Sequence, residues 1–390
     1  MEIGRIVRLL IDNTRKELLS GIDEKRKVMT SIFYPADHNL NEPKQSLYMD
    51  LFNPCPEEFI RRYAGEKNFE GQQVGESYLR SMSMNTYNNI PISKKAILYP
   101  VIIYSPGLGA DRDSIIYNIE KLVSAGYVVF TLGHTYDAEF TILPDGKIIE
   151  QAAYIANSTM EEKEQLIDIR KEDILFLLDN LKILNSDDEF IKEKLDLNKV
   201  GIMGHSLGGA AVFKAASEDT RIKAIIMLDG SLQFVNLTKE ILEGKRLHTP
   251  LLNFRRGFTD YSEEMKKAIE FNADKMNGED FKKRIIMRHQ VLIGQIERQK
   301  ELYEYLTGYK SFIKLKNSEH LTFTDWPVIR NQELVSGILP IKEAHEIISE
   351  ITVRFYNEFL CGMEGEYKNF ISSNKCPQIC MINKNGESLA

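Results

Sequence analysis

The 390-residue sequence has no surplus of positive charge, few cysteines and no hydrophobic run long enough to cross a bilayer. Its 50 Lys and Arg residues are outnumbered by 57 Asp and Glu residues, so the net charge of −7 offers no general attraction to nucleic-acid phosphates or anionic lipids. The longest hydrophobic run, 96–104, is interrupted by Pro100 and fits a buried strand, whereas a membrane-spanning helix needs about 20 apolar residues. We therefore expect no nucleic-acid partner and no integral membrane contact.

The start of the sequence and its cysteines favour a cytoplasmic location. Residues 1–6 lack the basic region, the long apolar stretch and the small-residue cleavage site of a secretory signal. Cys55 stands alone, and Cys361, Cys376 and Cys380 lie near the end without a histidine or a second cysteine pair at zinc-finger spacing. We interpret all four as reduced thiols rather than metal ligands, although the role of the last three and the oligomeric state stay open.

The length and composition indicate one large folded domain spanning 1–390. Hydrophobic residues make up 43% and charged residues 27% of the sequence, as in ordinary globular proteins, and no repeat or linker divides it. Short β-branched and aromatic runs alternate with longer amphipathic segments, which predicts an α/β fold with a mostly parallel sheet and helices on both faces. The predicted strands are Thr30–Tyr34, Pro100–Tyr104, Tyr127–Leu132, Lys199–Met203, Ile222–Leu228, Pro250–Phe254 and Ser311–Leu315.

The helical segments are of two kinds. Leucine and isoleucine recur at spacings of three and four in Arg170–Leu184, so this segment is predicted to pack on the sheet. Residues 232–310 are more highly charged, and they include two further predicted helices, Tyr261–Met276 and Phe281–Tyr305, around one short strand. We interpret 232–310 as a helical cap inserted into the main domain.

The sharpest motif is a Gly-x-Ser-x-Gly pattern at Gly204, Ser206 and Gly208. An apolar run precedes it and an alanine-rich segment follows, which is the strand–turn–helix context of a nucleophile elbow. Such a tight turn exposes the serine hydroxyl, and glycines on both sides avoid clashes with neighbouring backbone. The pattern predicts Ser206 as a nucleophile, the alternative being a glycine-rich turn without chemistry.

A neutral serine needs an imidazole to accept its proton. In this architecture the histidine follows the serine in the chain, and His320 does so on a loop just past the strand that ends at Leu315. We predict His320 as the general base, the alternative being a surface-loop histidine. The other six histidines precede the serine, lie in the elbow, precede a strand or fall in helical segments: His38, His134, His205, His248, His289 and His345.

The third member should be a carboxylate that orients the imidazole. Asp229 directly follows the run Ala224–Leu228, which places it at the C-terminal edge of the predicted sheet, where open α/β sheets gather their ligands. Its rival is Asp260, on the loop after the strand Pro250–Phe254. We favour Asp229, whose other possible role is that of a turn residue or a helix cap.

Attack on an ester creates an oxyanion that two backbone N–H groups can stabilise. One should belong to Leu207, directly after the nucleophile, and the other to the glycine-containing loop Ser105–Ala110. Within that loop we choose the N–H of Leu108. The loop could equally be a plain strand-to-helix turn, and the two roles are compatible.

Several separated blocks resemble the platelet-activating factor acetylhydrolase family, α/β-hydrolases related to bacterial dienelactone-hydrolase-like esterases. The blocks are Thr30–Ala36, Pro100–Gly109, Gly201–Gly209, Leu228–Gly230, and His320 with Phe323, Asp325 and Trp326. The sequence departs from the family at Pro106, where a histidine is frequent, and at Gly230-Ser231, which replaces a small-aromatic pair. Residues 232–309 match nothing in the family pattern.

The resemblance implies an α/β-hydrolase fold and hydrolysis of small carboxylic esters through an acyl-enzyme on Ser206, with no metal and no organic cofactor. Short-acyl phospholipids are substrates of some family members. Two alternatives remain. The same triad could serve an acyltransferase, amidase or peptidase, or the fold could persist in a non-catalytic binding protein.

Overall fold

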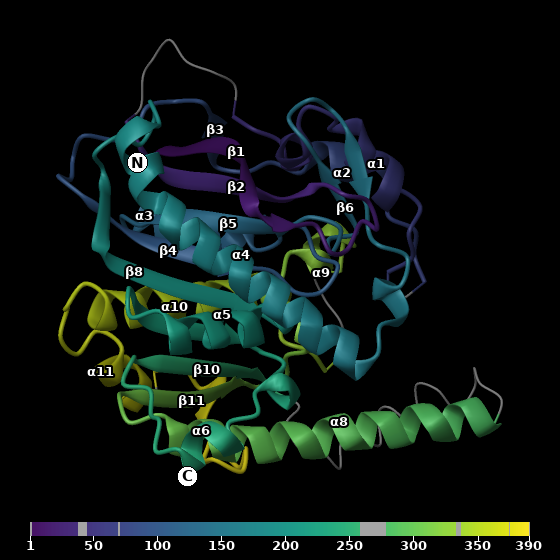
Figure 1. The fold of residues 1–390 in the computed structure, drawn as a ribbon, viewed down its shortest axis with the longest axis vertical. Helices are drawn as coiled ribbons and strands as arrows, with labels where there is room; N and C mark the ends of the chain where they lie inside the picture. Colours follow the sequence, from purple (N-terminus) through teal and green to yellow (C-terminus); the bar gives the residue numbers. More distant parts are fainter. Residues whose placement is uncertain are drawn as a thin grey trace.

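The computed structural model describes residues 2–37, 45–68, 71–257, 278–332, 337–373 and 375–389. Its centre is a ten-stranded sheet in the order β12-β11-β10-β9-β8-β4-β5-β2-β1-β3, with the strands running across the view in Figure 1. These strands are β1 (Glu2–Lys16), β2 (Lys25–Ala36), β3 (Thr86–Asn88), β4 (Tyr99–Ser105), β5 (Val128–His134), β8 (Leu195–His205), β9 (Ile222–Leu228), β10 (Leu251–Arg256), β11 (Lys310–Leu315) and β12 (Ile379–Met381). A separate antiparallel pair comprises β6 (Phe140–Ile142) and β7 (Ile148–Glu150).

The six consecutive strands from β5 to β11 pair in parallel, whereas β2, β1 and β12 add antiparallel partners towards the two ends. Parallel neighbours end at the same edge of a sheet. The last residues of β4, β8, β9 and β11 are Ser105, His205, Leu228 and Leu315, so the loops that follow them leave the sheet at one edge. Each of these four loops carries a residue predicted to belong to the site.

Helices cover both faces of the sheet. Val101 and Ile103 of β4 share a core with residues of α4 and α5, while Ile102 between them shares a second core with residues of α3 and α10. Because both faces are buried, β4 reads as a continuous hydrophobic run. The helices are α1 (Glu57–Tyr63), α2 (Glu76–Ser81), α3 (Ile116–Ser124), α4 (Met160–Asp187), α5 (Leu207–Glu218), α6 (Thr238–Leu242), α8 (Gly278–Tyr305), α9 (Trp326–Ile329), α10 (Ile341–Phe359) and α11 (Lys368–Ser372), with short 3₁₀ helices η1 (Tyr48–Phe52), η2 (Ile155–Asn157), η3 (Leu232–Phe234) and η4 (His320–Phe323).

All seven predicted strands are present in the sheet, and the predicted helix Arg170–Leu184 lies inside α4. The long first strand, β1, and the short strands β3 and β12 lie outside the predicted strands. β1 pairs with β2 along almost its whole length, but beyond Ile6 many of its side chains are partly or fully exposed. A strand with one solvated face gives a weaker hydrophobic signal than the buried central strands.

Residues 232–310 contain part of the main sheet as well as peripheral helices. β10 lies between β9 and β11, as the predicted strand Pro250–Phe254 requires. The predicted helix Phe281–Tyr305 corresponds to α8, which runs along the β11 side of the domain and projects outward in Figure 1. The predicted helix Tyr261–Met276 lies outside the described residues. That 232–310 acts as a cap stays a prediction.

Two properties bear on the expected environment of the chain. Within the described ranges, no helix combines the length and apolar character that crossing a membrane requires. Cys55, Cys361, Cys376 and Cys380 are free thiols of intermediate exposure.

Candidate active site

Ser206 occupies a strained turn between β8 and α5. Its φ and ψ of 52° and −120° lie in a region that non-glycine residues rarely adopt. The flanking glycines make the turn possible, since a Cβ on Gly204 would lie 2.4 Å from the Gly208 oxygen and one on Gly208 would lie 2.2 Å from the Ser105 oxygen. Local sequence therefore creates the geometry of a nucleophile elbow.

The structure brings the three predicted side chains together from three loops. The Nε2 atom of His320 lies 2.9 Å from the Oγ of Ser206, and its Nδ1 lies 2.5 Å from Oδ2 of Asp229. Such a chain of contacts lets an imidazole accept a hydroxyl proton while a carboxylate fixes its tautomer. The His320 side chain is 35% exposed and that of Asp229 only 2%, so the hydroxyl end of the relay is the more accessible one.

Asp229 sits among positive charges. Its Oδ1 lies 3.3 Å from Nη1 of Arg255, and Arg256 places its Nε 3.7 Å from Oδ2. Burial alone would raise the pKa of Asp229, but the two guanidinium groups and the hydrogen bond from His320 outweigh it, so that the pKa lies well below the ordinary value. The carboxylate is therefore ionised at neutral pH. The rival acid, Asp260, lies outside the described residues.

His205, the residue before the nucleophile, joins the elbow to the loop of His320. Its Nε2 donates a hydrogen bond to the main-chain oxygen of His320 at 3.0 Å. Burial, followed by the neighbouring His320, lowers the pKa of His205 to about 3, so the ring is neutral and Nε2 carries its proton. From the sequence, His205 is predicted only to lie in the elbow, so this contact is a finding of the structure.

The two predicted oxyanion donors border the elbow. Leu207 is the first residue of α5, so its N–H has no acceptor within the helix. Leu108 follows Gly107, where a Cβ would lie 3.4 Å from the Cβ of Ser206. On the far side of Leu108, the N–H of Gly109 is directed to Oδ1 of Asp137 at 3.4 Å. The loop Ser105–Ala110, called the oxyanion loop below after its predicted role, therefore lies against Ser206.

A second Ser-His-Asp set lies buried behind this loop. His134 at the end of β5 contacts Oγ of Ser105 through Nε2 and Oδ2 of Asp173 through Nδ1, both at 2.9 Å. The three residues are 0–1% exposed, so no substrate reaches them. His134 precedes Ser206 in the chain, which excludes it as the expected base, and nothing in the sequence pairs it with Asp173 of α4. We interpret this set as support for the loop rather than as a reaction centre.

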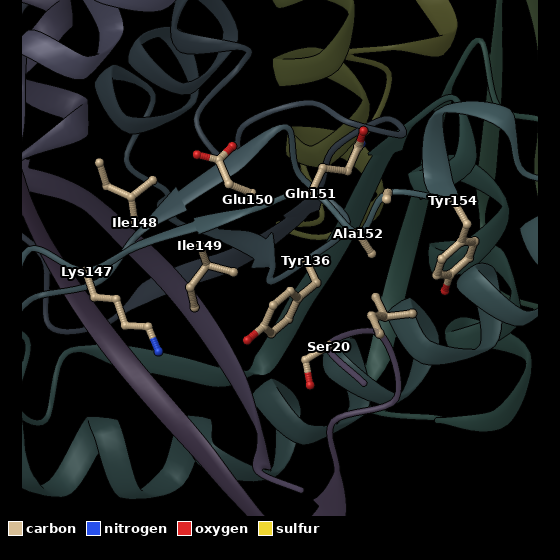
Figure 2. Close-up of a pocket in the computed structure, with 11 residues that line it drawn as sticks. Ser20, Tyr136, Lys147, Ile148, Ile149, Glu150, Gln151, Ala152 and Tyr154 are labelled. Carbon is tan, nitrogen blue, oxygen red and sulfur yellow. The ribbon is translucent and has the colours of Figure 1, made fainter. Parts of the chain in front are cut away.

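A pocket of about 500 Å³ is lined by β7, the residues that follow it, Tyr136 and the segment around Ser20. Figure 2 shows Tyr136, Ser20 and Tyr154 around it, while the Gln151 side chain points away from Tyr136 and Ser20. Gln151 instead donates from Nε2 to the main-chain oxygen of Asp137 at 2.7 Å. Because the lining residues include none of the predicted catalytic or oxyanion residues, this pocket is distinct from the candidate site.

Comparison with known proteins points to one family. The profile of the family described as platelet-activating factor acetylhydrolase, isoform II, matches residues 16–375. A platelet-activating factor acetylhydrolase of Cavia porcellus is 29% identical over 235 residues, which are 55% of this chain and 52% of the relative. A probable 1-alkyl-2-acetylglycerophosphocholine esterase of Arthroderma benhamiae is 30% identical over 135 residues, which are 34% of this chain and 32% of the relative. The chain thus spans about half, or less, of the length of these relatives.

The fold is also found in a solved structure. A ferulic acid esterase from Streptomyces cinnamoneus superposes with a TM-score of 0.70 and covers 98% of this chain and 96% of its own, at 20% sequence identity. At that identity the likeness concerns the fold alone. With the strand order described above, it confirms the expected α/β-hydrolase architecture.

Proposed function

Because the chain belongs to the platelet-activating factor acetylhydrolase, isoform II, family, we propose that it is a serine hydrolase that cleaves small carboxylic esters. The observation that carries the proposal is the continuous relay from Ser206 through His320 to Asp229, with contacts of 2.9 and 2.5 Å. A serine without a catalytic role would not require the strained backbone seen at Ser206.

In the proposed reaction, Oγ of Ser206 attacks the ester carbonyl carbon while Nε2 of His320 takes the hydroxyl proton. The carbonyl electron pair moves onto oxygen, and the N–H groups of Leu207 and Leu108 stabilise this oxyanion. Collapse of the tetrahedral intermediate expels the alcohol, which receives the proton from His320. Water then attacks the acyl-enzyme by the same steps and releases the carboxylic acid. Asp229 stays ionised and balances the imidazolium each time.

The names of the relatives support a short acyl group, since one is named an acetylhydrolase and another a probable 1-alkyl-2-acetylglycerophosphocholine esterase. We propose esters with short acyl chains as the substrate class, with an acetylated phospholipid among them. The four free thiols support a reducing, cytoplasmic location.

The test compares Ser206→Ala with Ser217→Ala, a substitution on the same helix at a residue whose hydroxyl contacts only the Phe213 carbonyl among the described residues. We expect the first variant to lose hydrolysis of an aryl acetate and labelling by a fluorophosphonate, and the second to keep both. A panel of aryl esters with acyl chains of two to about ten carbons then measures chain-length preference. Undiminished turnover by Ser206→Ala would refute the proposal, and an unchanged rate across the panel would refute the short-acyl preference.

A further inference from the structure

Arg170 of α4 binds the backbone of the oxyanion loop through its guanidinium group. Its side chain is 1% exposed, and its Nε and Nη2 lie 2.7 and 2.6 Å from the two carboxylate oxygens of Asp137. Nη1 donates to the main-chain oxygen of Pro106, and Nη2 also donates to that of Gly107 at 3.1 Å. A buried guanidinium therefore binds two consecutive carbonyls immediately before Leu108.

The carbonyl of Gly107 and the N–H of Leu108 belong to one peptide unit. That unit is planar and trans, so its C=O and N–H point in opposite directions. Because Arg170 of α4 binds the Gly107 oxygen, that oxygen faces Arg170. The Leu108 N–H of the same peptide unit therefore points away from Arg170. The same loop packs on the elbow, because a Cβ at Gly107 would lie 3.4 Å from the Cβ of Ser206.

We propose that Arg170, held by Asp137, is a positioning residue that fixes the direction of the Leu108 N–H for catalysis. This inference rests on the proposed function, because Leu108 matters in this way only if an oxyanion forms at Ser206. The Arg170–Asp137 ion pair contacts the loop on both sides of Leu108. Arg170 binds the Gly107 oxygen, and Asp137 accepts the Gly109 N–H at 3.4 Å. Rotation at either end of the loop would break a charge-assisted contact, and the one to Arg170 is buried.

Arginine suits this task better than lysine. Its planar fork presents five donors in a rigid arrangement, enough for a bidentate carboxylate and two carbonyls at once, whereas an ammonium offers three donors on a flexible stem. Arg170→Lys therefore keeps the charge and the pairing with Asp137 but should release one of the carbonyls.

Arg5→Lys is the matched control. Arg5 is also buried, pairs with Asp113 at 3.0 Å and donates to the main-chain oxygens of Asp50 and Leu51, none of which belongs to the oxyanion loop. The two variants should lose comparable thermal stability. A purely structural role for Arg170 would leave their kinetics equally close to wild type.

We expect Arg170→Lys to lower kcat on an aryl acetate by about 10- to 100-fold, somewhat less than complete loss of one oxyanion donor, with KM changed by less than about threefold. Affinity for an aryl trifluoromethyl ketone, whose hemiketal oxygen imitates the oxyanion, should fall by the same factor as kcat/KM. A folded Arg170→Lys protein with wild-type kcat and ketone affinity would overturn the inference.

A second measurement on the wild-type protein tests the inference even if Arg170→Lys does not fold. In a crystal structure of the wild-type protein with the ketone bound to Ser206, the hemiketal oxygen should lie within about 3.1 Å of the Leu108 nitrogen, with Arg170 still on the Gly107 oxygen. An oxyanion placed elsewhere would overturn the inference while leaving ester hydrolysis intact. Absence of both turnover and a ketone adduct would instead refute the proposed function.

Discussion

His205 donates a hydrogen bond to the main-chain oxygen of His320, and the two imidazole rings lie 4.6 Å apart between centroids. The residue beside the nucleophile thus anchors the backbone of the proposed base. A Cβ at Gly107 would lie 3.0 Å from Nδ1 of His205, so the oxyanion loop packs on the same ring. One neutral, buried side chain next to Ser206 therefore contacts both the His320 backbone and the predicted oxyanion loop.

Replacing His205 should impair turnover more than binding. In His205→Phe an aromatic ring is kept but the donor to His320 is lost, and we expect kcat to fall by about 10-fold or more with KM nearly unchanged, since a misplacement of about 1 Å can cost a factor of 100. His205→Gln can still donate from its amide and should recover much of the loss. Steady-state kinetics on an aryl acetate test both variants. A Phe variant as fast as wild type would show that the anchor is dispensable.

The pH profile should respond to the charge beside Asp229. Arg255 is buried and also donates to the Gly230 oxygen at 2.6 Å, so its guanidinium stays close to the carboxylate. In Arg255→Gln the carboxylate is less neutralised and stabilises a protonated His320 more strongly. We therefore expect the acidic limb of the kcat/KM profile to move to higher pH by several tenths of a unit or more.

Arg221→Gln provides the charge-matched control for this shift. Arg221 is 44% exposed and pairs with Asp219 and Asp179, away from the site. Its removal changes the net charge equally and should leave the profile in place. If both variants moved the limb alike, the cause would be overall charge rather than contact with Asp229.

The sequence could reveal the elbow because its requirements are local. A Cβ at Gly204 would meet the Gly208 oxygen four residues on, and Asp229 and His320 both follow predicted strands. The clash that Gly208 avoids is with the oxygen of Ser105, which is distant in the sequence, so that requirement shows only in the structure. The contacts of Arg170 and His134 could not be predicted, for the opposite reason. Their partners lie on other elements, and a charged residue on an amphipathic helix ordinarily predicts a solvated face. Only the packing of α4 on the sheet turns Arg170 inward.

Asp325 should make the stability of the protein depend on pH near neutrality. Its Oδ2 accepts hydrogen bonds from the Ile116 N–H at 2.7 Å and the Tyr48 hydroxyl at 3.1 Å, and burial raises its pKa to about 7. The same carboxyl in the unfolded chain titrates near 3.9. Between about pH 4 and pH 7 the folded chain keeps a proton that the unfolded chain has released, so the free energy of unfolding falls as the pH rises.

Asp325→Asn should remove that dependence, because its amide oxygen can accept the same hydrogen bonds without ionising. We expect the free energy of unfolding of the variant, relative to that of wild type, to rise by about 1 kcal/mol or more between pH 5 and pH 8. Urea unfolding at several pH values provides the measurement. Parallel stability curves for the two proteins would mean that Asp325 is ionised throughout.

Two glycine-to-alanine substitutions should have opposite effects. In Gly208→Ala the new Cβ would meet the backbone oxygens of Ser105 and Pro106 at 2.2 and 2.4 Å, and backbone cannot move aside as a flexible side chain can. The elbow or the oxyanion loop must shift, so we expect loss of most ester hydrolysis and a lower free energy of unfolding.

In Gly294→Ala, within α8, the Cβ meets only the Cβ of Gln233, at 3.7 Å, among the described residues. Alanine should stabilise that helix by about 0.5–1 kcal/mol and leave kcat unchanged. Urea unfolding and aryl acetate kinetics on both variants check the pair, and an active, fully stable Gly208→Ala protein would contradict the close approach of the oxyanion loop to α5.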